Sequence, residues 1–553
     1  MKKLALVAFL LAATYLPQAS AQSNDLPHLE KRDGHFALIV DGHPFLILGA
    51  QINNSSAWPA TLPNAWSAAE AMHVNTVEAP IYWEQMEPTR GTFDFSNVDL
   101  LVTQAHEHHL RLVLLWFGTW KNGQNHYVPE WIKSDPKTYP REENAYGKLL
   151  DVMSPSSPAT LEADKTAFTA LMRHLKSIDG SQHTVLMIQV ENESGSVGSV
   201  RDFSPAAQRA FEARVPADLA RTLHLPEGTW SQTFGPNADE SFEAYSISHY
   251  INQIAAAGKA EYALPMYCNV WFAYPVHALE NRDRPSPGQE YPSGGPQQAN
   301  IAIWKAAAPA IDILAPDFYS DDFSLFRSIV ATYARPDNPL FIPESHAGPN
   351  FGRYFFYALS HGAIGFAPFG IDHTPQPADQ PPPTAHVAAT PTENFTLFHA
   401  PNRQVAQLNF DGKLFTAVEE TGAARQTIHL PTVDAVVSFG FPQSDGTMPP
   451  GTPTLHGRAL VAQLGPLEFL VTGFDASVSF TLPATALQKT PNQQLEILHA
   501  EEGNYIDGAW HAARILNGDQ TDRGLNFHGS APSLVRIFLH ALPLYDEALH
   551  HDH

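Results

Sequence analysis

Two segments of the chain carry glutamates directly after runs of apolar residues. Glu191 and Glu193 end the run at 184–193, and Glu344 ends the run at 339–345. In a barrel of parallel strands, functional side chains lie at the carboxyl ends of the strands and can meet over the barrel axis. Two carboxyl groups about 5–5.5 Å apart can cleave a glycosidic bond, one as nucleophile and the other as acid and base. The alternative is that each glutamate caps a helix or lies on a solvated loop.

Eight apolar runs alternate with helix-length stretches between about residues 36 and 373. Runs that are apolar throughout suit parallel strands buried on both faces. The expected strands cover residues 46–52, 74–83, 110–118, 184–193, 266–272, 313–319, 339–345 and 363–370. Helices are expected between them, for instance at residues 67–73, 96–109 and 157–178. Eight strands separated by helices predict an α/β fold of the (β/α)8 TIM-barrel type.

From residue 411 onward, the sequence changes to alternating strand-like runs separated by Gly/Pro turns. We therefore expect a barrel over residues 22–410 and an all-β, sandwich-like domain over 411–553. The Pro-rich stretch at 373–391 cannot form a regular helix or a central strand. It is either a domain linker or an active-site loop after the eighth strand, and we favour the loop. Residues 393–410 have helical spacing, interrupted at Pro401, and are expected to form the last barrel helix. Strands of the second domain are expected at residues 435–441, 458–464, 468–474, 477–482 and 534–542.

The first 21 residues have a basic start, an apolar run and a small-residue end, Ala19-Ser20-Ala21. This pattern predicts a secretory signal peptide that is cleaved before Gln22. A membrane anchor is the weaker alternative, because the apolar run is shorter than the ~20 residues that a membrane span needs. The sequence therefore predicts an exported protein, periplasmic or extracellular.

Composition excludes several classes of partner and cofactor. Lys and Arg number 33 against 57 Asp and Glu, and the net charge of −24 opposes binding to nucleic acid and to anionic membranes. With Cys268 as the single cysteine, neither an intramolecular disulfide nor a cysteine-based zinc site can form. The 27 histidines include no HExxH zinc motif. We expect neither a metal nor an organic cofactor.

Two stretches resemble glycoside hydrolase family 35, the β-galactosidases with (β/α)8 barrels and catalytic glutamates on strands four and seven. Residues 74–100 resemble the family signature N-T-V…W-N-x-H-E-P-x-x-G-x-F-D-F, and residues 189–194 match Q-x-E-N-E-Y up to Ser194, which replaces the tyrosine. The resemblance runs over most of the barrel. The β-rich tail looks like the C-terminal module of a bacterial branch of the family.

The resemblance implies that Glu193 is the general acid and base and Glu344 the nucleophile. It also implies that Asn192 holds the 2-hydroxyl of the substrate. Tyr319, at the end of the sixth strand, is a natural hydrogen-bond donor to Glu344. In a regular strand Glu191 shares a face with Glu193, so the resemblance, not the strand geometry, selects Glu193 over Glu191 as the acid.

Aromatic rings are expected to stack on the sugar, and several lie at or just past strand ends. Of Trp83, Trp116, Trp120 and Trp271, we expect two to touch substrate, with Trp116, Trp120 and Trp271 as the candidates. The chain departs from the family at Trp83-Glu84-Gln85-Met86-Glu87-Pro88, where the family has W-N-x-H-E-P. Glu84 can supply a replacement hydroxyl acceptor there.

Taken together, the residues and the resemblance predict an exo-acting retaining β-galactosidase. Its expected substrates are oligosaccharides that end in galactose, such as plant xyloglucan fragments. Long segments at 194–245, 273–300 and 373–391 favour a closed pocket and therefore exo action. Two alternatives stay open: a related retaining glycosidase that prefers another sugar, arabinose or glucose for example, and a noncatalytic carbohydrate-binding barrel. Two close carboxylates argue against the binder, because they repel each other without any gain in binding.

Overall fold

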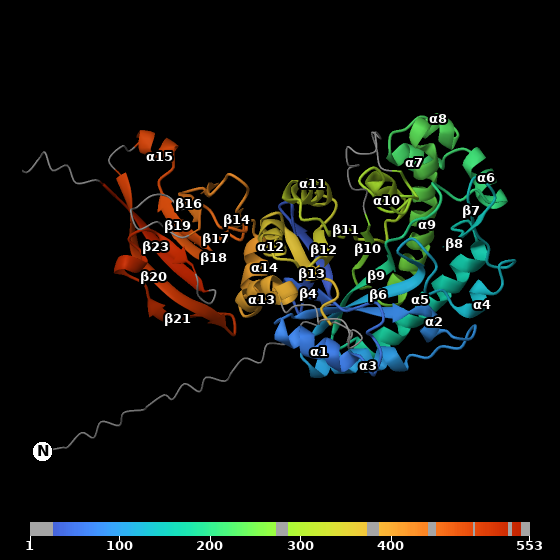
Figure 1. Ribbon diagram of the computed structural model, residues 1–553, viewed down its shortest axis with the longest axis horizontal. Coiled ribbons are helices and arrows are strands. Elements are labelled where there is room, and N and C mark those ends of the chain that lie inside the picture. The colour runs from blue at the N-terminus through green and yellow to red at the C-terminus, as the bar shows by residue number, and fades with distance from the viewer. Residues whose placement is uncertain are drawn as a thin grey trace, which may run out of the picture.

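The computed structural model describes residues 26–271, 286–372, 386–440, 450–489, 493–528 and 533–543. Its largest sheet has eight parallel strands in the order β11-β10-β9-β6-β5-β4-β13-β12 (Figure 1). These are β4 (Ile47–Gln51), β5 (Thr76–Tyr82), β6 (Arg111–Lys121), β9 (Val185–Asn192), β10 (Met266–Val270), β11 (Ile313–Pro316), β12 (Leu340–Ser345) and β13 (Ala363–Pro368). All eight predicted strands are present, so the prediction of a (β/α)8 barrel is confirmed.

A short backbone bridge joins the two end strands of this sheet, β11 and β12. The Phe318 N–H donates to the Glu344 carbonyl at 2.9 Å, and the His346 N–H donates to the Phe318 carbonyl at 3.2 Å. The bridge closes the barrel just beyond β11. It also places the two neighbours of Phe318, Asp317 and Tyr319, beside the end of β12.

Helices surround the barrel strands. The helix that precedes β9 shows which sequence features begin such a helix and bury one of its faces. In α5 (Pro158–Asp179) the Ser157 side chain accepts a hydrogen bond from the Thr160 N–H, and Pro158 occupies the first turn. Its apolar face, which includes Leu171, is buried, and the helix packs against the helix at residues 238–261 and against β6. The other helices between β4 and β13 are α1 (Leu62–Ala71), α2 (Trp83–Met86), α3 (Ser96–Glu107), α4 (Glu130–Lys133), α6 (Pro205–Glu212), α7 (Ala217–Thr222), α8 (Trp230–Phe234), η1 (Gly235–Asn237), α9 (Ala238–Glu261), α10 (Ile301–Ala307), α11 (Phe323–Tyr333) and α12 (Phe351–Ser360). The three helices named from the sequence match α1, α3 and α5. No helix in the described part of the chain is long and apolar enough to cross a bilayer.

Two small antiparallel sheets that the sequence pattern did not reveal are added to the barrel. One consists of β1 (His28–Arg32), β2 (His35–Val40) and β3 (His43–Phe45), and the other of β7 (Arg141–Glu143) and β8 (Leu149–Met153). The first precedes the barrel strands and the second follows β6. Both are built of short strands, for which alternation is a weak signal.

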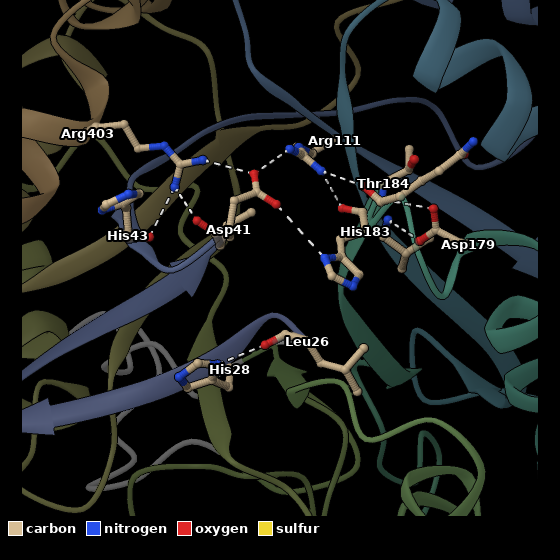
Figure 2. A network of polar contacts seen from close by, with 12 residues as sticks. Leu26, His28, Asp41, His43, Arg111, Asp179, His183, Thr184 and Arg403 are labelled. Carbon is tan, nitrogen blue, oxygen red and sulfur yellow. Dashed lines mark hydrogen bonds and ion pairs between the residues drawn. The ribbon is translucent and has the colours of Figure 1, made fainter. Parts of the chain in front are cut away.

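A polar network ties the turn between β2 and β3 to the amino-terminal ends of the barrel strands (Figure 2). Asp41 Oδ2 accepts from Arg111 Nη2 at 2.7 Å and from Arg403 Nη2 at 3.3 Å. Arg111 begins β6 and also donates to the His183 carbonyl, just before β9. Asp179, at the end of α5, accepts the backbone N–H groups of Thr184 and Val185. This end of the barrel is therefore held together by matched charges and satisfied backbone groups.

The chain continues after β13 through two helices, α13 (His386–His399) and α14 (Asn402–Phe410). They reproduce the predicted helix with its break at Pro401. The helix reaches back to His386, however, and contains Pro391, so the exclusion of a helix was wrong for the last residues of 373–391. Proline removes one backbone bond, and α13 persists because its following turns bury Phe395 and Phe398 against Phe355. Residues 373–385 and the predicted signal peptide lie outside the described residues.

Two antiparallel sheets form the C-terminal part of the molecule, at the left of Figure 1, and confirm the β-rich, sandwich-like prediction. Side chains from both sheets, such as Val437, Val478 and Ile537, share one buried cluster. One sheet contains β14 (Leu414–Val418), β17 (Arg458–Gly465), β18 (Glu468–Phe474), β23 (Leu534–Pro543), β20 (Gln493–Ile506) and β21 (Ala509–Ile515), in that order. The other contains β15 (Arg425–His429), β16 (Asp434–Phe439), β19 (Ala476–Thr481) and β22 (Leu525–Phe527). Two short helices, α15 (Ala484–Lys489) and η3 (Gly518–Gln520), complete this part.

The six-stranded sheet also packs against the barrel, through α12 and α13 (Figure 1). Arg458 of β17 is fully buried at this junction. Its Nη2 donates to Glu393 Oε2 at 3.0 Å and its Nε to Asn394 Oδ1 at 3.0 Å, both on α13. Burial lowers the pKa of Arg458 to about 10, which still leaves it charged at neutral pH. A buried, paired arginine fixes the C-terminal sheets on the barrel.

Candidate active site

A cavity of about 420 Å³ opens at the carboxyl ends of the barrel strands. Its lining residues follow seven of the eight strands, all but β5. They are Asn54, Lys121, Asn122, Glu193, Trp271, Asp317, Tyr319, Glu344 and Phe369. The two glutamates selected from the sequence are thus brought to one cavity although 151 positions of sequence separate them.

Glu344 lies near the end of β12 and is held by two hydrogen-bond donors. Gln51 Nε2 donates to its Oε2 at 3.2 Å, and the Tyr319 hydroxyl donates to its Oε1. The contact that the sequence led us to expect between Tyr319 and Glu344 is present. Two donors on one carboxyl group favour its ionised form and fix its direction. The Tyr319 pKa is raised, by burial and then by the Glu344 charge, so the hydroxyl keeps its proton.

Glu193 directly follows β9 and faces the same cavity. Its backbone N–H donates to Asn269 Oδ1 at 2.9 Å, and its Oε2 accepts from Asn122 Nδ2 at 2.7 Å. Burial and then the nearby Glu344 carboxylate raise the pKa of Glu193 to about 7, while Lys121 opposes the shift. At neutral pH Glu193 therefore exists in both protonation states, which suits a group that first gives and later takes a proton.

The backbone of β9 explains why Glu193 and Glu191 differ. Both have positive φ angles, 44° at Glu193 and 65° at Glu191, which non-glycine residues adopt rarely and mostly at functional sites. The regular alternation of a strand is lost there, so the two side chains do not share a face. Glu191 Oε2 accepts from the Trp120 N–H at 2.7 Å, away from the cavity lining. Strand geometry alone could not choose between the two glutamates. In the structure, Glu193 lines the cavity and Glu191 does not.

Close packing holds the Glu191 carboxyl group in its place. Its Oε1 lies 2.8 Å from where a Cβ on Gly118 would stand, so glycine is needed there. Asp164, the carboxyl neighbour of Glu191, accepts from Trp116 Nε1 at 3.0 Å and from the Thr119 hydroxyl at 2.5 Å. Burial raises the pKa of both acids, and the Asp164 charge raises that of Glu191 further. The pair forms a closed polar cluster behind the cavity wall.

Asn192, between the two glutamates, is fully buried. Its Oδ1 accepts from Lys121 Nζ at 2.9 Å, while its Nδ2 has no hydrogen-bond partner among the described residues. A buried amide donor without a partner leaves a hydrogen bond for a ligand to satisfy. Asn192 adjoins the lining residue Lys121 but does not itself line the cavity.

Among the predicted aromatic contacts, the structure brings Trp271 alone to the cavity. Trp116 and Trp120 are fully buried: Trp116 bonds to Asp164, and Trp120 packs edge-on against Tyr250 with ring centroids 5.0 Å apart. Both were expected to touch sugar, and both are core residues because their strand, β6, runs on past them to Lys121. Glu84 of α2 is half-exposed and faces Lys133 at 3.9 Å, so it does not supply an acceptor to the cavity.

A third acid at the cavity, Asp317, was not predicted. Its Oδ2 accepts from Asn269 Nδ2 at 2.7 Å. Carboxyl oxygens of Glu193, Asp317 and Glu344 lie within 4.8 Å of one another. Three oxygens at this spacing are also the one arrangement in the described part of the chain that could hold a metal ion. The signal for Asp317 was a charged residue within the sixth predicted strand, two positions before Tyr319.

Lys121, Asn122 and Asn54 were also missed by sequence reasoning. Lys121 and Asn122 lie beyond the predicted end of the third strand, because β6 ends three residues after the apolar run does. The Asn122 N–H donates to the Asn192 carbonyl at 3.2 Å, so the two strand ends are paired and carry both side chains to the mouth. A pattern of apolar residues does not predict this extension, since Thr119 and Lys121 interrupt the pattern.

A (β/α)8 barrel with two close carboxyl groups, one after its fourth strand and one near the end of its seventh, has the arrangement of acids that glycoside hydrolases use. The model of glycosyl hydrolases family 35 matches residues 37–269, which include the first four barrel strands and all but the last residue of the fifth. This match confirms the resemblance to family 35 seen in the sequence. A domain of unknown function, DUF5597, matches residues 392–528.

Individual relatives are distant. A β-galactosidase of Xanthomonas manihotis is 26% identical over 219 residues, 38% of this chain and 33% of that protein. The human beta-galactosidase-1-like protein 3 is 29% identical over 194 residues, 34% of this chain and 27% of that protein. The chain thus spans about a third or less of these relatives' length. Among solved structures, a β-galactosidase from Bacillus circulans sp. alkalophilus has 13% identity and a TM-score of 0.47, over 65% of this chain and 57% of that one.

Proposed function

We propose that the protein is an exo-acting retaining β-galactosidase that removes terminal, non-reducing β-D-galactosyl residues from oligosaccharides. The observation that carries this proposal is the spacing of Glu193 and Glu344, whose carboxyl oxygens approach within 4.8 Å. Retaining enzymes place these groups about 5–5.5 Å apart, whereas inverting enzymes separate them by about 6.5–9.5 Å to admit a water molecule. The spacing supports direct attack by one carboxylate on the sugar.

In the first step, the Glu344 carboxylate attacks the anomeric carbon and the bond to the leaving oxygen breaks. Glu193 gives its proton to that oxygen, so the leaving group departs as a neutral alcohol. Gln51 and Tyr319 hold the attacking carboxylate in position through their hydrogen bonds. This step leaves the sugar as an ester of Glu344 and Glu193 as a carboxylate.

In the second step, Glu193 takes a proton from water, and the resulting hydroxide oxygen displaces Glu344 from the sugar. The electrostatics favour this change of role. The Glu344 charge is one of the causes that raise the pKa of Glu193, and that charge is absent from the ester. The pKa of Glu193 therefore falls in the intermediate, and the group becomes a carboxylate that can act as base.

The galactose assignment is supported by the family match and by two groups near the acids. Lys121 lines the cavity, and its ammonium group, which also donates to Asn192 Oδ1, is suited to donate to a sugar hydroxyl. The Trp271 ring at the cavity wall is suited to stack on the apolar face of the sugar. A cavity of about 420 Å³ falls in the range of small-ligand sites and fits one terminal residue.

We extend the proposal to the substrate and its location. Xyloglucan fragments from plant cell walls, which carry terminal galactose, are the proposed natural substrates. The predicted signal peptide at residues 1–21 supports action outside the cytoplasm, in the periplasm or the medium.

Nitrophenyl glycosides test the sugar and the chemistry together. We expect turnover of the β-D-galactoside, with little or none of the β-D-glucoside or the α-L-arabinoside. Proton NMR during the first minutes should show β-galactose as the initial product, because two displacements retain configuration. α-Galactose as the first product would refute the retaining mechanism, preference for another glycoside would refute the galactose assignment, and no turnover would favour a binding protein. Galactose release from xyloglucan oligosaccharides, without shortening of their backbone, tests exo action.

A further inference from the structure

Asp317 is a third buried carboxyl group at the cavity, and the two-step reaction makes no use of it. It directly follows β11 and is 3% exposed. Its oxygens lie within 4.8 Å of carboxyl oxygens of both Glu193 and Glu344. A group so close to both reacting acids must affect their charge.

The charges around Asp317 do not balance if every acid is ionised. Glu193, Asp317 and Glu344 would bring three negative charges. Among the described residues that line the cavity, Lys121 is the one lysine or arginine, so it supplies a single positive charge. The other titratable groups facing Asp317 are tyrosines, which are neutral when protonated; they are Tyr267, Tyr319 and Tyr333. Like charges this close in a buried site cannot all persist, so at least one carboxyl group must hold a proton.

The hydrogen bonds indicate which acid holds the proton. Glu344 receives two donors, Gln51 and Tyr319, and is thereby stabilised as a carboxylate. Asp317 receives a donor from Asn269 on Oδ2 only, and its buried Oδ1 accepts no hydrogen bond from the described residues. A buried carboxyl oxygen without a donor is satisfied when it carries the proton itself.

One amide connects Asp317 to Glu193. Asn269 Oδ1 accepts from the Glu193 N–H, and Asn269 Nδ2 donates to Asp317 Oδ2. Asn269 thus fixes the Asp317 carboxyl group relative to the backbone of Glu193. The Oδ1 atom is the oxygen of Asp317 left to interact with the Glu193 side chain.

We propose that Asp317 remains protonated in the resting enzyme and donates a hydrogen bond to Glu193, as a positioning residue that sets the proton affinity of the acid and base. This inference rests on the proposed function of Glu193. When Glu193 gives its proton to the leaving oxygen, the Asp317 O–H stabilises the carboxylate that forms. A neutral donor makes Glu193 a stronger acid, whereas an ionised Asp317 would make it a weaker one.

Electrostatics agree with this arrangement. Burial, followed by the charges of Glu344 and Glu193, raises the pKa of Asp317 well above its usual range. The hydrogen bond from Asp317 acts in the opposite direction on Glu193 and lowers its pKa. Of the two neighbours, Asp317 is thus the one that retains its proton.

The pH dependence of kcat/KM for nitrophenyl β-D-galactoside tests the proposal in two variants. Asp317→Ala removes the donor, so the alkaline limb, which reports the loss of the Glu193 proton, should move up by about half a pH unit or more. Asp317→Asn keeps an N–H donor of the same size, so its limb should stay within about 0.3 units of wild type. Asp218→Asn, on an exposed residue of α7, is the control for removal of an aspartate charge.

The direction of the shift decides the outcome. Movement of the Asp317→Ala limb to lower pH would mean that Asp317 is ionised, and a lower kcat with an unmoved limb would mean that Asp317 acts only in packing. Either result overturns the proposal.

A second measurement does not depend on turnover. In protein labelled with carbon-13 at the aspartate carboxyl carbons, the signal absent from Asp317→Asn should keep the chemical shift of a protonated carboxyl group at pH 6. A carboxylate shift there overturns the proposal even if the galactoside is not turned over. An inactive wild type with a protonated Asp317 would instead count against the proposed function alone.

Discussion

The two ends of the barrel differ in their balance of acidic and basic side chains. At the amino-terminal end, Asp41 lies between Arg111 and Arg403, and His183 Nδ1 is 3.9 Å from its second oxygen (Figure 2). At the carboxyl-terminal end, three acids face the cavity with Lys121. Acids are outnumbered by basic groups at one end and outnumber them at the other.

The difference shows what each end does. A carboxylate matched by arginines links segments that are distant in sequence, here the β2–β3 turn, β6 and α14, and so stabilises the fold. Unmatched carboxyl groups cost stability, and a protein retains them where chemistry needs them. In barrels of this kind, reacting groups lie at the carboxyl ends of the strands and stabilising ones at the opposite face.

The Glu191–Asp164 pair shows that burial and a raised pKa do not by themselves mark a reacting group. These two acids are as buried as Glu193 and have raised pKa values. Trp120 donates to Glu191 Oε2, Trp116 and Thr119 donate to Asp164, and neither acid lines the cavity. Access to the cavity separates Glu193 from Glu191.

The largest effect is expected from removal of the nucleophile. Glu344→Gly should lower kcat on nitrophenyl β-D-galactoside by about 10⁴-fold or more, because no other group is placed to attack the sugar. Added azide should restore product as the α-galactosyl azide, since the small anion can enter the space left by the side chain. Glu162→Gln, on an exposed residue of α5, is the matched control and should keep wild-type kcat. Azide product of β configuration would contradict the assignment of Glu344.

Removal of the acid should have the next largest effect, and it depends on the leaving group. Glu193→Ala should lose about 10²–10⁴-fold in kcat/KM on alkyl galactosides, but less than about tenfold on dinitrophenyl galactoside, whose leaving group needs no proton. Glu191→Gln should show no such dependence on the leaving group. The reverse pattern in these two variants would make Glu191 the acid.

The two ends of the barrel can be compared directly by thermal unfolding. Asp41→Asn should lower the free energy of unfolding by about 1–3 kcal/mol, because Arg111 and Arg403 lose their shared partner. Asparagine tolerates the positive φ of 53° at this position, so the turn itself should persist. Glu344→Gln should leave the melting temperature unchanged or raise it, since it removes charge from the crowded mouth. A lower melting temperature for Glu344→Gln than for Asp41→Asn would contradict the view that acids stabilise the amino-terminal end of the barrel and not the carboxyl-terminal end.

The smallest effect concerns pH in the unmodified protein. Because Glu193 must carry a proton to act as acid and its pKa is raised to about 7, kcat/KM should fall as the pH rises through about 7. Below that pH, Glu193 is protonated and the rate should level off. In Glu193→Ala, the alkaline limb near pH 7 should be absent. Its persistence there would assign the limb to another group.

The sequence by itself determined the architecture and the two strand ends that carry the candidate acids. Apolar runs of strand length, repeated eight times, specify a barrel because each strand is buried on both faces, and every run became a strand. Glu191, Glu193 and Glu344 could be found as candidates because a residue near the end of an apolar run is expected at the barrel mouth, and the family resemblance then selected Glu193 over Glu191. The Tyr319 contact followed from the same rule.

Only the tertiary structure decided between Glu191 and Glu193, since the positive φ angles that separate them have no signature in residue type. It also buried Trp116 and Trp120, brought Lys121 to the mouth and set Asp317 beside both acids. These outcomes depend on where a strand ends and on which neighbours surround each side chain. Apolar periodicity reports which residues are buried, but the partners of a buried polar group come from distant parts of the chain.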